Sequence, residues 1–197
     1  MTDMKTLLLG ASLMIASTAS SFAQDGQTTD FRGFSWGTSL AQVQSQEKAQ
    51  LVVKIKDDEL QYADLLAGSD CYVIYIFNDN DKLISGNYVF TKKYSNPELY
   101  LQDYNKFKDL LTQKYGKPVS DDTHFHSNAP SVEKHSYGQA ISDGYLTMDA
   151  IWNVNGSLIK IALISTDRSP SLQIHYTSDS LNGLENKAAL KQVLTKL

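Results

Sequence analysis

The chain has 197 residues and a formal net charge of −4, with 42% apolar and 20% charged residues. This length fits one ordinary domain or two small ones, and the composition argues against disordered and fibrous folds. Of the 18 basic residues, two are arginines, Arg32 and Arg168. Because such a chain cannot assemble a basic patch to neutralise phosphates, we expect no nucleic-acid partner.

The N-terminal residues have the pattern of an export signal. A lysine precedes an apolar run over residues 7–16, and Ser21 and Ala23 occupy the −3 and −1 positions of a cleavage site. This pattern predicts a secretory signal peptide over residues 1–23, and its apolar run is too short to span a bilayer. We therefore expect residues 24–197 to form a single α+β domain, without a membrane span, that is periplasmic or secreted.

The chain contains one cysteine, Cys71. An exported chain with a single cysteine forms no intrachain disulfide. Because Cys71 lies in the apolar run 71–77, we expect a buried strand residue, in preference to a catalytic or intermolecular thiol.

A first helix is predicted after Gly37. Ser39 and Gln42 have the spacing of a capping box, and Leu40, Val43 and Glu47 share one helical phase. Predicted strands follow over residues 51–56, 60–66, 71–77 and 83–90. The turn-forming residues 78–81 predict a hairpin loop between the last two of these strands.

The second helix has the clearest pattern. Asn96 is the predicted N-cap, Pro97 takes the first helical position, and Gly116 and Pro118 end the helix. Its apolar stripe consists of Tyr100, Tyr104, Phe107, Leu111 and Tyr115.

A polar loop is predicted over residues 120–131. Further strands are predicted over residues 132–141, 145–153, 158–165 and 172–177. Residues 142–144 carry the strongest short hairpin signal, and Asn155-Gly156 and residues 168–170 are predicted turns. Strand faces alternate between apolar and polar residues. We therefore expect a largely antiparallel meander sheet with helices on one face and water on the other.

Two segments have similar sequences, which we call the sequence echo. Residues 77–84 and 152–159 share the pattern aromatic-Asn-x-Asn-x-x-Leu-Ile. One interpretation is an internal repeat of α-β-β-β-β units, with halves 31–94 and 95–197 and a C-terminal helix capped by Asn182. The other is that turns between strands converge on asparagine.

Residues 33–37, Gly-Phe-Ser-Trp-Gly, match the nucleophile elbow of α/β-hydrolases. That motif requires a buried strand immediately before it. Residues 25–30 are polar, so a nucleophilic role for Ser35 is disfavoured, and packing under the first helix is the preferred interpretation of Phe31, Phe34 and Trp36.

Three histidines have ligand types that suit zinc or copper: His124, His126 and His135. His124 and His126 lie in the predicted polar loop, and His135 follows it. Because nothing there fixes a second shell, we expect solvated side chains and no metal or cofactor. His175 alternates onto the polar side of its strand and is expected at the surface.

Tyrosine is unusually abundant, with 11 residues. A tyrosine-rich sheet face could recognise a partner or an aromatic ligand. The alternative is structural, because tyrosine favours strands and half-buried helix stripes.

Residues 31–37, residues 114–118 (Lys-Tyr-Gly-Lys-Pro) and the strand around Trp152 carry a resemblance. The chain resembles small uncharacterised bacterial exported proteins with a W-G-x-S helix start and a KYGxP helix end. More distantly, it is similar to the repeats of the β-lactamase-inhibitor-protein-like group and of small outer-membrane assembly lipoproteins. It differs from these in lacking a lipid-anchor cysteine and in having a longer second helix. The resemblance implies a protein-binding module, and no family site residue is carried over.

These observations predict an exported, non-enzymatic binding protein of the bacterial envelope: an assembly accessory, an inhibitor or an immunity-type protein. Its partner would be another envelope or secreted protein. The alternative is a periplasmic protein that binds a metal or a small ligand in a pocket between helix and sheet. A hydrolase is the less favoured third class. No individual residue is assigned to catalysis, to a partner or to a metal.

Overall fold

The computed structural model describes residues 30–55, 58–126, 129, 131, 133 and 136–181. The predicted signal peptide, His135 and the predicted C-terminal helix lie outside the described residues. Among the described residues, no helix is both long and apolar enough to cross a membrane.

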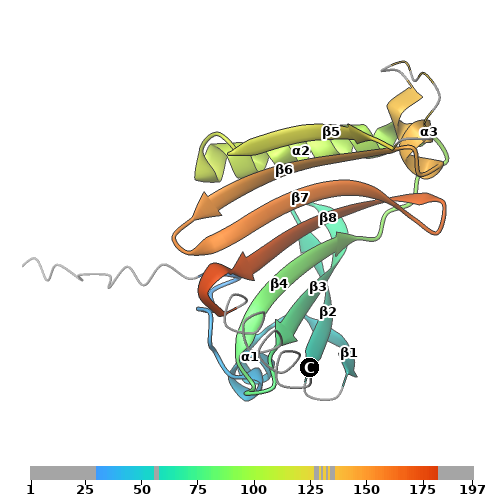
Figure 1. Ribbon diagram of the computed structural model, residues 1–197. Helices are drawn as coiled ribbons and strands as arrows, with labels where there is room; N and C mark the ends of the chain where they lie inside the picture. The colour runs from blue at the N-terminus through green and yellow to red at the C-terminus, as the bar shows by residue number, and fades with distance from the viewer. Residues whose placement is uncertain are drawn as a thin grey trace, which may run out of the picture.

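The described residues form three helices and eight strands. The helices are α1 (Leu40–Gln46), α2 (Leu99–Tyr115) and α3 (Tyr137–Ser142). The strands are β1 (Gln50–Ile55), β2 (Glu59–Leu66), β3 (Ser69–Phe77), β4 (Leu83–Phe90), β5 (Ser120–Phe125), β6 (Leu146–Val154), β7 (Ser157–Thr166) and β8 (Ser169–Ser178). All eight strands join one curved antiparallel sheet in the order β1-β2-β3-β4-β8-β7-β6-β5 (Figure 1). The predicted antiparallel α+β fold is confirmed.

The two halves of the sheet meet where β4 pairs with β8. Gly86 lies opposite Tyr176, and Tyr88 lies opposite Ile174. On either side of this seam a helix precedes four strands: α1 before β1–β4, and α2 before β5–β8, with α3 inserted after β5. The sequence echo, however, relates the β3–β4 connection to the β6–β7 connection. These connections are not equivalent in the strand order, so the repeat stays a prediction.

The capping box of α1 and the glycine end of α2 are confirmed, whereas the predicted N-cap of α2 at Asn96 is wrong by two residues. Ser39 and Gln42 form the capping box of α1. At α2, Asn96 Oδ1 accepts a hydrogen bond from the Glu98 N–H (3.0 Å). Three successive i→i+3 hydrogen bonds then make a tight first turn, and the α-helix begins at Leu99, two residues after the predicted start. Gly116 ends α2 with φ of 83°, a conformation that favours glycine.

Three hairpins have two-residue turns with positive φ at both positions. They are Ala67-Gly68, Asn155-Gly156 and Asp167-Arg168. This conformation matches the twist of the flanking strands. The predicted turn at Asn155-Gly156 is confirmed. The turn predicted at residues 168–170 lies slightly earlier in the chain, and Pro170 already pairs with Ser165.

Two predicted elements between α2 and β6 are wrong. Residues 120–125 belong to strand β5, although they were expected in a polar loop. They lack apolar alternation and are held by main-chain pairing with β6 and by an ion pair from Lys108 Nζ to Asp121 Oδ2 (3.0 Å). The strand predicted over residues 132–141 is also wrong, because its second half forms α3.

The hairpin predicted at residues 142–144 is wrong for the same reason. These residues end α3 and lead into β6, and the Gly144 N–H donates to the Ile141 carbonyl oxygen (3.0 Å). Gly138 allows α3 to lie directly against the chain before α2, because a Cβ at Gly138 would come within 2.4 Å of the Pro97 carbonyl carbon.

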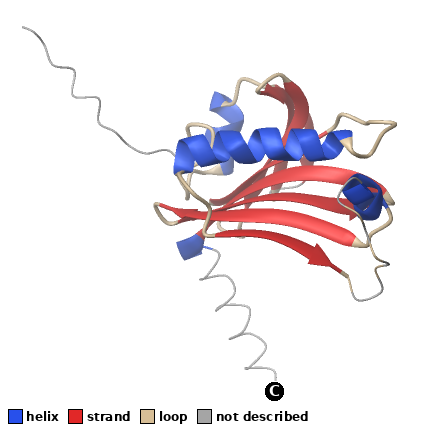
Figure 2. Cartoon of the chain, turned by 90° about the horizontal axis from the view of Figure 1, so that it is seen from above, coloured by secondary structure: helices blue, strands red, loops and turns tan. Residues whose placement is uncertain are grey.

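A single hydrophobic core lies between the sheet and the helices. Phe31 from the segment before α1, Tyr104 and Phe107 from α2, and Trp152 from β6 are each at most 2% exposed. The Trp152 indole N–H donates to the Gly116 carbonyl oxygen (2.8 Å), which fixes the end of α2 over β6. Figure 2 shows α2 and α3 on one side of the sheet. The opposite side carries no helix among the described residues, and we call it the open face.

Candidate functional site

The open face is defined by the strand register. In β3, Cys71, Val73, Tyr75 and Phe77 are buried on the helix side. The alternating residues Tyr72 and Ile74 therefore point to the open face. Across the sheet, Ile74 lies opposite Gln61 in β2 and Asn87 in β4. The open face thus runs from one edge strand, β1, to the other edge strand, β5.

Exposed apolar side chains gather at the β1 end of the sheet. Six of the nine large apolar side chains that are exposed among the described residues lie in β1, β2 and β3: Leu51, Val52, Val53, Ile55, Leu65 and Tyr72. We call these six residues the apolar patch. A concentration of exposed apolar residues at one place marks an interaction surface more often than scattered single residues do.

The two edge strands differ sharply. Every residue of β1 is exposed, four of its six residues are large and apolar, and Lys54 is its single charged side chain. The edge strand β5 instead carries Asp121, Asp122 and His124. Charged residues on an edge oppose pairing with another strand, whereas an apolar edge invites pairing. The β1 edge has one irregularity in its register, between Leu51 and Val53. Among the described strands, β1 is therefore the edge open to a further strand.

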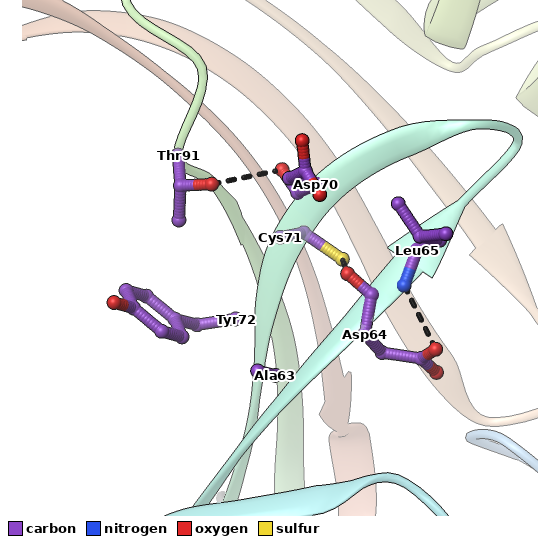
Figure 3. A pocket seen from close by; sticks show the side chains of 7 residues that line it. All are labelled: Ala63, Asp64, Leu65, Asp70, Cys71, Tyr72 and Thr91. Atoms are coloured by element: carbon purple, nitrogen blue, oxygen red, sulfur yellow. Dashed lines mark hydrogen bonds between the residues drawn. The ribbon is translucent and has the colours of Figure 1, made fainter.

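A hollow of 380 Å³ lies where β2 ends and β3 begins, next to the Ala67-Gly68 turn that joins them (Figure 3). Its lining consists of Ala63, Asp64, Leu65, Asp70, Cys71, Tyr72 and Thr91. The small Ala63 lies opposite Tyr72, and Leu65 lies opposite Asp70, which leaves room between the larger side chains. The hollow therefore adjoins the apolar patch and offers one carboxylate, that of Asp70, on the open side.

The thiol of Cys71 has low reactivity. Cys71 is 3% exposed. Burial, followed by the charge of Asp64, raises the pKa of the Cys71 thiol to about 11. The thiol is therefore protonated at neutral pH and is a poor nucleophile. The prediction of a buried strand residue is confirmed.

An ion-pair network behind the hollow fixes β2 and β3 to the N-terminal segment. Arg32 Nε and Nη2 each lie 3.1 Å from an oxygen of the Glu47 carboxylate. Arg32 Nη2 also lies 2.6 Å from Asp64 Oδ2. The Tyr75 hydroxyl donates a further hydrogen bond to Glu47. Three segments that are distant in sequence are therefore joined at one guanidinium group.

Glu47 is held ionised in this network. Its side chain is 5% exposed. Burial alone raises the pKa of Glu47, but hydrogen bonds from Arg32, from the Tyr75 hydroxyl and from the Ala49 N–H outweigh burial and lower the pKa to about 2. The arrangement is a structural anchor, because both oxygens of the Glu47 carboxylate accept hydrogen bonds from Arg32 within the protein.

The opposite end of the open face is polar. Asp149 is 8% exposed and lies 3.1 Å from His124 Nε2 and 3.4 Å from Lys160 Nζ. Nearer the centre of the sheet, His175 Nδ1 of β8 lies 2.9 Å from Asn87 Oδ1 of β4. Burial, assisted by the charge of Lys160, lowers the pKa of His175. His175 faces the polar side as predicted, but it is half-buried and hydrogen-bonded.

Of the predicted metal-ligand candidates, His124 and His126 lie among the described residues, and His135 does not. His124 lies on β5 and contacts Asp149, whereas His126 follows the strand and its N–H donates to the Tyr145 carbonyl oxygen (2.9 Å). Among the residues that the structure describes, no group of three or more His, Cys, Asp or Glu side chains could hold a metal ion. The expectation that these histidines lie in an irregular loop is wrong for His124.

Ser35 lies in the turn before α1. Its carbonyl oxygen accepts hydrogen bonds from the Thr38 N–H (3.1 Å) and hydroxyl (2.7 Å). Within the described chain, no buried strand precedes Ser35, so the geometry of a nucleophile elbow is not present. Phe31 and Phe34 are 2% and 7% exposed, which confirms the predicted packing role of this segment.

The sequence contained one overlooked signal for the Arg32 network. Glu47 lies on the same helical phase as the buried Leu40 and Val43. An acidic residue on an apolar phase needs a cation, and Arg32 is the single basic residue in the segment 30–36.

Comparison with protein-family models, with curated proteins and with solved structures finds no match to this chain.

Proposed function

We propose that this protein is an exported, non-enzymatic binding protein of the bacterial envelope, and that it binds an extended segment of another envelope or secreted protein along β1. The observation that carries the proposal is the apolar patch: four exposed large apolar side chains on the edge strand β1 and two more on β2 and β3. Strand addition of this kind uses main-chain hydrogen bonds for affinity and side-chain contacts for specificity.

The surface beside β1 supports such recognition. Val53 and Ile55 lie opposite Gln61 and Glu59, so both point to the open face next to the added strand. Beyond β1, the open face continues over Leu65 to the 380 Å³ hollow, which a side chain of the partner outside the added strand could enter. Apolar anchors that enter such hollows supply much of the affinity of protein interfaces.

The charge of β1 favours a foreign segment over a second copy of this chain. Lys54 is the single charged residue of β1, and Lys48 is also exposed nearby. In a symmetric antiparallel pair of β1 strands that overlap along their full length, Lys54 would lie opposite Leu51, and no carboxylate of either β1 strand would neutralise it. The acidic edge β5 of another copy would complement Lys54 in charge, but the charged side chains of β5 oppose pairing with a further strand. We therefore infer a partner segment with alternating apolar residues and at least one acidic residue.

The choice between assembly accessory, inhibitor and immunity-type protein depends on the identity of the partner. The resemblance to β-lactamase-inhibitor-like repeats and assembly lipoproteins supports this group of functions. The protonated Cys71 thiol and the absence of an elbow at Ser35 are consistent with a non-enzymatic role.

Site-specific photocrosslinking in intact cells tests the proposal. A photoreactive residue replaces Val53 in β1 and, as the matched control, Thr123 in the edge strand β5. We expect one discrete adduct from Val53 and none from Thr123, and we expect Ile55→Lys to abolish it. A peptide that spans the crosslinked partner segment should then bind the purified protein and shift the β1 amide resonances in NMR spectra.

Three results would reject the proposal. These are equal labelling from the two positions, an adduct with a second copy of this chain, and a partner peptide that shifts resonances elsewhere while those of β1 stay unchanged.

A further inference from the structure

A second cavity lies on the helix side of the sheet, away from β1. It has a volume of 170 Å³ and lies between the C-terminal half of α2, the β2–β3 turn and the centre of the sheet. Phe107 and Leu111 of α2 form one wall, and Ile174 and Tyr176 of β8 form the floor. These four residues are at most 7% exposed, so the inner wall of the cavity is fixed by the core.

The size of the cavity suits a small apolar group. An apolar protein cavity of about 150 Å³ stays dry and binds benzene. A cavity of 170 Å³ therefore has room for about six carbon atoms. Leu110, which is 40% exposed, lies at the rim, so a ligand can enter beside it without unfolding of the helix.

A positively charged side chain, that of Lys114, lies at the rim of the cavity. Lys114 lines the cavity from the last turn of α2, and its Nζ lies 4.8 Å from the centre of the Tyr115 ring. No carboxylate lines the cavity, and Lys114 forms no ion pair with the residues that the structure describes. An apolar hole with an unneutralised ammonium group at its mouth is complementary to an anion with a short apolar tail.

The opposite rim is held in place by a second lysine. Lys106 Nζ donates to the Ala67 carbonyl oxygen (3.0 Å) in the β2–β3 turn. Ala67 lines the cavity and has φ of 47°, so the turn is a two-residue hairpin of defined shape. The cavity is therefore bounded by α2 and by the β2–β3 hairpin, which the Lys106 hydrogen bond joins.

We propose that this cavity binds a small amphipathic carboxylate, with an aliphatic or aromatic tail of about six carbons inside and the carboxylate at Lys114. The site is separate from β1 and does not depend on the proposed strand addition. A short-chain fatty acid and an aromatic acid such as benzoate share this chemistry, and the ligand series below distinguishes them.

The experiment is an NMR titration of the purified protein with hexanoate, benzoate, hexanol and hexylammonium. We expect saturable shifts of the Ile174 and Leu111 methyl groups, with hexanoate or benzoate binding more tightly than hexanol and hexylammonium binding weakest. For burial of about five methylene groups we expect a dissociation constant on the order of 1 mM.

Three variants sharpen the test. Lys114→Gln should weaken carboxylate binding by about threefold to fivefold, the effect of an exposed ion pair, and should leave hexanol binding unchanged. Lys117→Gln, which removes an exposed lysine outside the lining, is the matched control. Leu110→Trp should block all binding by filling the mouth. The proposal would be overturned by non-saturable shifts, by shifts outside the cavity, by equal affinity for hexylammonium, or by equal effects of Lys114→Gln and Lys117→Gln.

Discussion

The ring of Phe31 lies directly on the backbone of Gly86. A Cβ atom on Gly86 would come within 2.1 Å of Phe31 Cδ1, a distance that real Cβ contacts do not show. Gly86 pairs with Tyr176 at the seam between the two halves of the sheet, and Phe31 also contacts the Tyr75, Tyr88 and Tyr176 rings. The segment before α1 therefore closes the core at the centre of the sheet.

Gly86→Ala should destabilise the fold, because the added methyl group displaces the Phe31 ring. We expect a loss of about 2 kcal/mol in the free energy of unfolding, as for other overpacked cores. Phe31→Leu makes room for the methyl group, so the double variant should be more stable than the sum of the single effects predicts. Urea denaturation of the four proteins measures this coupling, and strict additivity would contradict the contact.

Glu47→Gln should reveal how much the buried carboxylate contributes to the free energy of unfolding. The pKa of about 2 in the folded protein, against an ordinary value of 4.5, corresponds to roughly 3 kcal/mol of stability. Because the folded pKa is the lower one, this contribution is complete above pH 5 and is lost as the pH falls towards 2. Urea melts between pH 7 and 2 should show this loss in the parent protein and a shallower dependence in the variant. Parallel curves would contradict the network.

His175→Gln should change the pH dependence in a different range. Burial lowers the pKa of His175 below 6.5, so the unfolded chain takes up the proton first. The stability that depends on neutral His175 is therefore present above pH 6.5 and declines as the pH falls below it. The variant should have a flatter stability curve between pH 7 and 5. An unchanged slope would show that His175 is as accessible to protons in the fold as in the unfolded chain.

Cys71 should resist thiol reagents in the folded protein. A pKa of about 11 against 9.0 lowers the thiolate fraction about 100-fold at neutral pH, and burial adds a steric barrier. Labelling with a disulfide reagent should therefore require denaturant and should follow the unfolding curve. Rapid stoichiometric labelling without denaturant would contradict the burial of Cys71.

Charged substitutions on β1 should leave the fold intact. Val53 and Ile55 are 39% and 49% exposed and contribute little to the core. Val53→Lys and Ile55→Lys should each change the free energy of unfolding by no more than about 0.5 kcal/mol. The matched substitution in the core, Val73→Lys, buries an unpaired charge at a position that is 0% exposed and should prevent folding. A large loss of stability for Val53→Lys would show that β1 is covered within the protein.

The sequence by itself determined the elements whose signals are local. The apolar stripe of α2 and its end at Gly116, the capping box at Ser39 and the Asn155-Gly156 turn depend on residues that act within a few positions, and each was found where predicted. The start of α2 was predicted two residues too early. The buried environment of Cys71 was equally predictable, because an apolar run in a strand can be stable only against a core.

Tertiary structure alone decided the rest, because long-range contacts supplied what local residues lack. Strand β5 has no apolar alternation and forms through hydrogen bonds to β6 and the ion pair with Lys108. The β4–β8 seam, the ion pair of Arg32 with Asp64, and the hydrogen bond from Lys106 to Ala67 all join segments far apart in the chain. No local pattern specifies such pairings. They follow from how one sheet buries its apolar face against three helices.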